Sequence, residues 1–82
     1  MAVISGMVIE RFSNRSVSGA TITIGSATTY SDSSGRFSVF VPDTGVVYVS
    51  ASAPGYEPYS ASINASFANS TTIFLSQRFG FL

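Results

Sequence analysis

Residues 20–41 read ATITIGSATTYSDSSGRFSVFV, and along most of this stretch apolar side chains alternate with polar ones. The residues that fall on the apolar face are Ala20, Ile22, Ile24, Phe37, Val39 and Val41. A period of two residues is typical of strands that have one buried and one solvated face. The stretch therefore predicts short strands packed against a core, while Phe40 points the other way and requires cover of its own.

Extended to the whole chain, the same pattern predicts seven strands and no helix. The predicted strands are residues 2–10, 20–25, 27–31, 36–41, 46–53, 59–64 and 71–76. RFSVFV is expected to be the hairpin partner of ATTYS, and Gly6 is expected to mark a β-bulge. Seven short strands separated by turn signals predict an all-β fold, a seven-stranded antiparallel Greek-key β-sandwich of the Ig-like type.

The composition limits the classes of function. The chain has 82 residues, no Cys, no His and a net charge of zero from four arginines and four acids, so it predicts one small domain held together by apolar burial. A neutral, charge-poor surface predicts no nucleic-acid partner and permits self-association. No apolar run is long enough to span a membrane, and the first residues lack the pattern of a signal peptide.

The stretch SDSSGRF, residues 31–37, allows three interpretations. As a calcium loop it has a single carboxylate, Asp32, where such loops need several. As a catalytic site it would use one of its serines as the nucleophile, but the chain has no His, Lys or Cys to act as the base. As a turn it is complete, because Asp32 can accept backbone hydrogen bonds, Gly35 supplies a positive φ and Phe37 returns to the core. The sequence therefore predicts a structural turn, with no catalytic residues, no metal and no cofactor.

Several short segments together resemble a known family. They are ISGMVIE, VSGATITI, SDSSGRF, APGYEP and TTIFL, and they resemble the carboxypeptidase regulatory-like domain, a transthyretin-like β-sandwich. The resemblance implies an accessory domain without shared catalytic residues, of a kind found beside enzymes, on surface proteins, in adhesins and in viral particles. It implies turn positions at Gly19, Gly35 and Gly55 and core anchors at Phe37 and Tyr56. The PGYEP segment, which ends the fifth predicted strand, adds Pro54 as a turn position. It divides the chain into a domain, 1–76, and an apolar tail, 77–82.

The two ends of the chain suggest contacts between copies. The tail carries Phe79, Phe81 and Leu82, which either cover the sandwich they belong to or dock on a neighbouring copy. The first strand begins with Val3 and Ile4, which either pair within their own sheet or exchange between protomers. These five residues are the predicted interface.

Two further patterns concern sugars. Asn14, Asn64 and Asn69 stand in glycosylation triplets, although asparagine also favours turns. The four tyrosines either form a platform for sugar stacking or pack within their own strands; they are Tyr30, Tyr48, Tyr56 and Tyr59.

Together these features predict a non-enzymatic structural assembly module. It would be a self-associating subunit or decoration protein of a virus particle or extracellular filament, located on an extracellular surface or a virion. Its partners would be copies of itself or other structural proteins. The alternative is an accessory or adhesion module that recognises glycans or a host surface.

Overall fold

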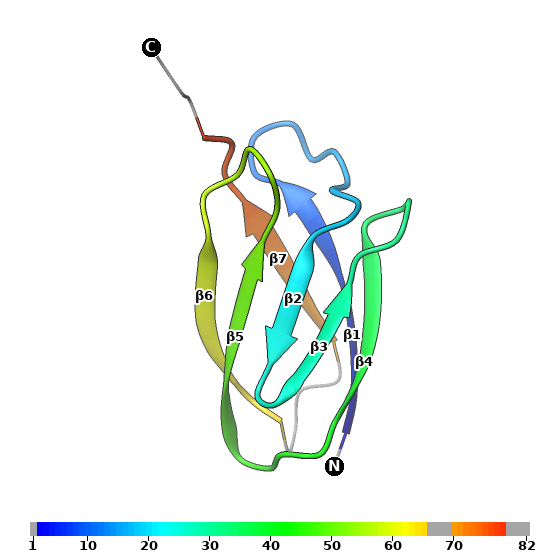
Figure 1. The fold of residues 1–82 in the computed structure, drawn as a ribbon, viewed down its shortest axis with the longest axis vertical. Coiled ribbons are helices and arrows are strands. Elements are labelled where there is room, and N and C mark those ends of the chain that lie inside the picture. Colours follow the sequence, from blue (N-terminus) through cyan, green and yellow to red (C-terminus); the bar gives the residue numbers. More distant parts are fainter. Residues whose placement is uncertain (1, 66–69, 79–82) are drawn as a thin grey trace.

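The computed structural model describes residues 2–65 and 70–78, which form seven strands in two sheets packed face to face (Figure 1). The strands are β1 (Ala2–Glu10), β2 (Thr21–Ile24), β3 (Ala27–Tyr30), β4 (Arg36–Val41), β5 (Val46–Ser52), β6 (Tyr59–Asn64) and β7 (Ser70–Leu75). One sheet has the order β4-β1-β7 and the other β3-β2-β5-β6. The predicted all-β sandwich of seven strands is confirmed.

The core lies between the two sheets and uses the side chains that the alternation places inward. Its largest fully buried members are Ile4, Val8, Ile22, Ile24, Val41, Val49, Ile73 and Leu75. The predicted inward face of Ile22 and Ile24 in β2 is confirmed, and β5 alternates in the same way between buried and more exposed positions. Phe40 indeed points away from the core and is 53% exposed.

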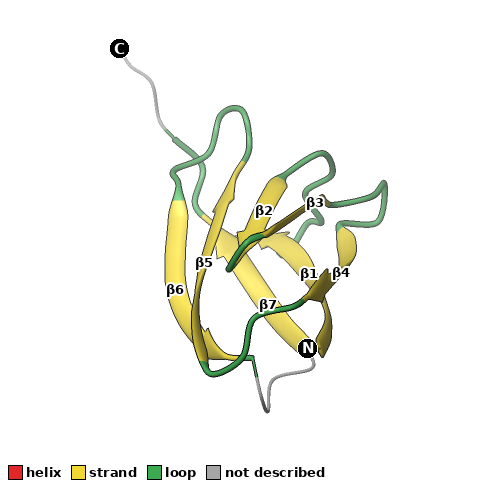
Figure 2. Ribbon diagram, turned by 60° about the horizontal axis from the view of Figure 1, so that its bottom comes forward, coloured by secondary structure: helices red, strands yellow, loops and turns green. Residues whose placement is uncertain are grey.

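The sandwich is not wholly antiparallel. β1 and β7 run side by side in the same direction, with registers from Ser5↔Ser70 to Glu10↔Leu75, as Figure 2 shows for the three-stranded sheet. The remaining strand pairs are antiparallel. The strands nearest the two ends of the chain are therefore neighbours.

The predicted hairpin between ATTYS and RFSVFV is wrong. β4 pairs with β1 in the other sheet, from Ala2↔Val41 to Met7↔Arg36, so the turn at 31–35 carries the chain from one sheet to the other. The backbone N–H of Ser31 still donates to the carbonyl of Ala20 (3.0 Å) and ends the pairing with β2. A compact turn follows and redirects the chain at this corner.

Gly6 does not mark a bulge. Its register runs without interruption, with Phe37 as its partner in β4 and Thr71 in β7. A Cβ at Gly6 would overlap the carbonyl oxygen of Thr71 and lie 2.9 Å from the Cζ of Phe37. The glycine is needed because the Phe37 ring and the β7 backbone occupy the space of a side chain.

Candidate functional site

The stretch SDSSGRF forms a turn built around one carboxylate. The Oδ1 atom of Asp32 accepts hydrogen bonds from the backbone N–H of Ser34 (2.8 Å) and of Arg36 (2.9 Å). Gly35 has a φ of +77°, and Phe37 is buried. The structure thus places Asp32, Gly35 and Phe37 in the positions that the turn interpretation expects.

Ser31, considered above as a nucleophile, is a buried residue whose hydrogen bonds are structural. Its hydroxyl donates to the carbonyl of Val17 (2.7 Å) and accepts from the backbone N–H of Ala20 (2.9 Å). Both bonds hold the loop before β2 against the corner between the sheets. Sequence reasoning missed this role because the partners are distant in the chain.

Each of the four carboxylates has a partner of its own. Asp43 accepts from the backbone N–H (3.0 Å) and the hydroxyl (2.9 Å) of Ser26, which joins the β2–β3 turn to the β4–β5 turn. Glu57 pairs with Arg78 at 3.4 Å on the exposed surface, and Glu10 accepts from the hydroxyl of Ser13. Within residues 2–65 and 70–78 no three acidic side chains gather into a group able to hold a metal. The separate partners of the carboxylates are those expected of side chains that hold turns and loops in place.

These hydrogen bonds predict an acid-sensitive contribution to stability. The backbone N–H donors of Arg36 and Ser34 lower the pKa of Asp32, and the backbone N–H and hydroxyl of Ser26 lower the pKa of Asp43. A lowered folded-state pKa stabilises the protein above the unfolded-state value, about 3.9, and this contribution is lost as the pH falls through the folded-state pKa. We expect the urea midpoint to fall between about pH 6 and about pH 2, and to fall less in Asp43→Asn.

The matched control for this measurement is Glu57→Gln, which removes an exposed carboxylate whose partner is a side chain. It should keep the acid response of the parent chain. If Asp43→Asn retains the full acid response as well, the bonds from Ser26 do not contribute to it.

The outward face of the three-stranded sheet carries an apolar strip. We call Val3, Met7, Ile9, Phe40 and Phe74 the outward strip. Val3 and Phe40 are direct partners across β1 and β4 and are 57% and 53% exposed. At the other end, Ile9 is the partner of Phe74. The strip thus has one apolar cross-strand pair at each end, and Met7 lies between them, separated from the Val3–Phe40 pair by Ser5 and Ser38.

Of the predicted interface residues, the strip retains only Val3. Ile4 points into the core and has no exposed surface, so in this fold its side chain cannot reach a partner; the prediction for Ile4 is corrected. Exchange of β1 between protomers would also have to break two ladders, because β1 is the central strand of its sheet. Phe79, Phe81 and Leu82 lie outside the described residues.

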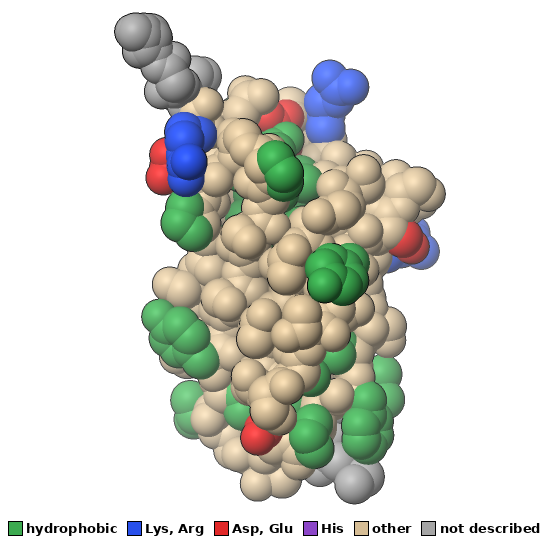
Figure 3. Space-filling model, viewed as in Figure 1, with side chains coloured by type: hydrophobic (Ala, Val, Ile, Leu, Met, Phe, Trp, Pro, Cys, Tyr) green, Lys and Arg blue, Asp and Glu red, His purple; other side chains and the backbone are tan. Residues whose placement is uncertain are grey.

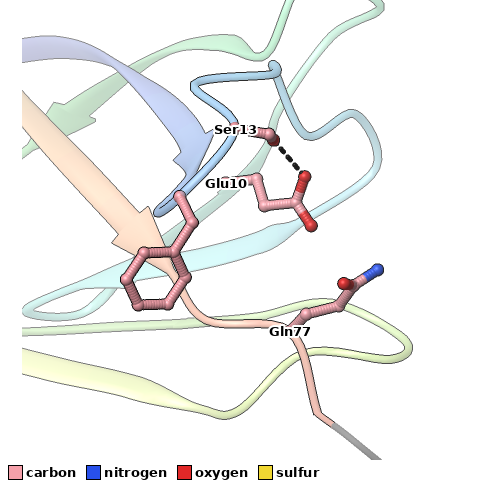
Figure 4. Close-up of a pocket in the computed structure, with 4 residues that line it drawn as sticks. Glu10, Ser13 and Gln77 are labelled. Atoms are coloured by element: carbon pink, nitrogen blue, oxygen red, sulfur yellow. Dashed lines mark hydrogen bonds between the residues drawn. The ribbon is translucent and has the colours of Figure 1, made fainter.

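The end of the sandwich near Gln77 has a hollow of about 290 Å³ (Figure 4). It is lined by Glu10, Phe12, Ser13 and Gln77, and Phe12 is 86% exposed. The Glu10 carboxylate is turned toward the Ser13 hydroxyl. With one carboxylate and one exposed ring, the hollow offers an apolar contact beside the point where the chain passes into the tail.

The tyrosines do not form a common platform. Tyr56 and Tyr59 pack against the core, whereas Tyr30 and Tyr48 are 65% and 64% exposed. Tyr30 borders an open groove of about 430 Å³ between the adjacent edges of β3 and β4. This groove combines an aromatic ring with polar side chains.

The remaining predicted positions lie in turns or at strand ends. Asn14 is exposed at a φ of +59°, and Asn64 is exposed at the end of β6; Asn69 is outside the described residues. Pro54 and Gly55 are exposed, and Tyr56 bridges to Gln77.

Two features of the surface were missed from the sequence. The alternation Ile73–Phe74–Leu75 already implies that Phe74 faces outward, which would have extended the outward strip to β7. Arg36 reaches the groove only because β4 lies in the other sheet, and nothing local in the sequence signals that change.

Comparison with known proteins agrees with this architecture. The profile of the carboxypeptidase regulatory-like domain matches residues 3–76. No curated protein sequence matches the chain at a significant level.

The part of the chain that the structure describes contains no helix with the length and hydropathy needed to span a membrane.

Proposed function

Because the chain belongs to the carboxypeptidase regulatory-like domain family, we propose that it is a non-enzymatic assembly module. It acts as a self-associating subunit or decoration protein of a virus particle or extracellular filament, on an extracellular surface or a virion. The observation that carries this proposal is the exposed Val3–Phe40 pair in the outward strip.

The strip has the properties of an interaction surface. Apolar side chains that lie together on an exposed sheet face are stabilised when water is excluded from them, by about 25 cal/mol per Å². At the other end of the strip Arg11 already covers Phe74, with its guanidinium 6.0 Å from the ring centre. The described residues provide no such cover for Val3 and Phe40, which remain the most exposed part of the strip.

A second copy of the chain is the partner that best fits this face. The net charge of zero gives little repulsion between copies. The outward residues of the three strands include one charged side chain, Arg36, at the end of β4 remote from Phe40. A two-fold contact would place the Val3–Phe40 pair of each copy against that of the other.

The area that a stable interface must bury determines how much of the outward strip has to take part in the contact. The chain has an accessible surface of 4825 Å², so an interface of standard size, about 800 Å² per partner, would cover about a sixth of it. The Val3–Phe40 pair alone is too small. The contact therefore has to extend along the strip toward Met7.

Light scattering over a concentration series tests the proposal. The parent chain should form dimers or larger particles, and the double variant Val3→Thr/Phe40→Thr should shift the association midpoint by about tenfold or more toward higher concentration. Threonine is favoured in β-strands, as valine and phenylalanine are, so the fold should persist in the double variant. A parent chain that stays monomeric throughout would refute self-assembly.

Two controls separate the strip from other surfaces. Val46→Thr removes an apolar side chain that is 73% exposed in β5 and should leave association unchanged. Deletion of residues 79–82 tests the tail separately and keeps the hydrogen bond from the N–H of Arg78 to the carbonyl of Gly55 (2.8 Å). If the deletion abolishes assembly and the double variant does not, the tail is the docking element and the strip is not.

Glycan recognition, the alternative function, is favoured by a different surface, the groove beside Tyr30. This groove is separate from the Val3–Phe40 pair, because Phe40 lies four residues along β4 from Arg36, about 13 Å away. It adjoins the strip only at Met7, the partner of Arg36.

A further inference from the structure

The groove between β3 and β4 lies at the corner where the chain passes from one sheet to the other. Its lining residues are Thr29, Tyr30, Asp32, Arg36, Phe37 and Ser38. Its volume of about 430 Å³ is within the range of small-ligand sites, about 300–1,000 Å³. Figure 3 shows acidic and basic atoms together at the right-hand margin of the molecule, on the side of β3 and β4.

The turn fixes one polar group of this groove, the Asp32 carboxylate. Asp32 Oδ1 takes both backbone hydrogen bonds, from Ser34 and Arg36, which leaves Oδ2 as an acceptor for a ligand. The Arg36 guanidinium is exposed and offers several N–H donors in one plane. The Thr29 hydroxyl donates to the carbonyl of Ser38 (3.4 Å) and ties the two edges together. The groove is therefore lined by a carboxylate that the turn holds and by an exposed arginine.

The aromatic part of the groove is Tyr30. Its ring is 65% exposed at the end of the edge strand β3, where it presents an apolar face next to polar side chains. Aromatic rings with this exposure provide rigid contact area at low cost in side-chain entropy. An apolar ring face beside opposite charges suits a ligand that has both C–H faces and hydroxyl groups.

The sheet beyond Tyr30 is also uncharged. β2, β3, β5 and β6 contain no charged residue, and Figure 3 shows this face mostly in tan, the colour of the backbone and of side chains that are neither charged nor hydrophobic. Thr21 and Ser52 continue the row of Tyr30 across the sheet. A ligand chain that leaves the groove in this direction meets hydroxyl groups and no fixed charge.

We propose that the groove between β3 and β4 binds a sugar ring of a neutral glycan, with Tyr30 stacked on the ring and Asp32 and Arg36 hydrogen-bonded to its hydroxyl groups. The neighbouring acid and base cancel in charge, so the groove does not favour an anionic or a cationic ligand. Arg36 is the β4 partner of Met7, so the groove adjoins the outward strip at this end. Tyr30 belongs to the other sheet, so loss of glycan binding in Tyr30→Ala would leave the assembly proposal unaffected.

The test is binding of the full chain to an array of neutral and acidic glycans, followed by titration calorimetry with the strongest neutral oligosaccharide. We expect a neutral glycan to bind, and Tyr30→Ala to weaken its affinity by about tenfold or more. Tyr48→Ala is the matched control, since Tyr48 is 64% exposed in β5 and does not line the groove. It should bind as the parent chain does.

Arg36→Gln provides a second variant, because it removes the charge and most donors without touching the turn carboxylate. It should also weaken binding, while the circular dichroism spectrum remains that of the parent. The proposal is overturned if no neutral glycan binds, if acidic glycans alone bind, or if Tyr30→Ala and Tyr48→Ala have equal effects.

Discussion

Replacing Gly6 with alanine is expected to remove about 3 kcal/mol or more of the free energy of unfolding, the upper end of the range for overpacked sites. The new methyl group would overlap the carbonyl oxygen of Thr71, a backbone atom of the adjacent strand, and would lie 2.9 Å from the Phe37 ring. β1 is the central strand of its sheet, so a displacement there disturbs both ladders. Since total stability is about 5–15 kcal/mol, this loss would remove about a fifth to more than half of it.

Urea unfolding of Gly6→Ala measures this loss. Thr72→Ala, in which an exposed side chain of β7 is shortened, is the control and should change stability by less than about 0.5 kcal/mol. The double variant Gly6→Ala/Phe37→Leu should recover little, because leucine relieves the ring contact and leaves the backbone overlap. A loss below about 1 kcal/mol in Gly6→Ala would show that β1 and β7 can separate at this point without cost.

Gly35→Ala is expected to cost about 3 kcal/mol from two independent sources. The φ of +77° is unfavourable for a residue with a Cβ. In addition, that Cβ would lie 2.8 Å from the carbonyl oxygen of Val8 and 2.8 Å from the Cβ of Ser16. The Gly35 carbonyl accepts from the N–H of Val8 (2.7 Å), so the turn cannot move away without losing its bond to β1.

Gly19→Ala separates the two sources. Gly19 has nearly the same φ, +73°, but a Cβ there would have no atom within 4 Å. Its loss should reflect conformational strain alone, about 1–2 kcal/mol. Equal losses of stability at Gly19 and Gly35 in thermal or urea unfolding would mean that packing against β1 adds nothing.

The strands could be predicted from the sequence because each is a local pattern. Alternation in ATITIG and VVYVSASA specifies which side chains share a face, and the residues between the strands supply turn chemistry. The structure agrees within about two residues at every strand end, the usual scatter of such boundaries. The resemblance to the family rests on the same local features.

Strand pairing could not be predicted in the same way. A turn such as SDSSGRF reverses the chain whether the next strand joins the same sheet or the opposite one, because its hydrogen bonds are internal. What selects the opposite sheet is contact with distant residues: Phe37 against Gly6, and Gly35 against Val8. Arg36 and the groove itself were missed for this reason, since Arg36 comes beside Tyr30 only after the crossover.

The parallel pairing of β1 and β7 determines how the domain would respond to mechanical tension. Because the two strands run in the same direction, the first residue of β1 and the last residue of β7 lie at opposite ends of the sandwich, as Figure 1 shows. Force applied at these two points would slide the strands lengthwise and load all the bonds of the ladder together, instead of opening them one at a time. In a filament or particle under strain, this geometry would favour slow forced unfolding, which is governed by the unfolding rate.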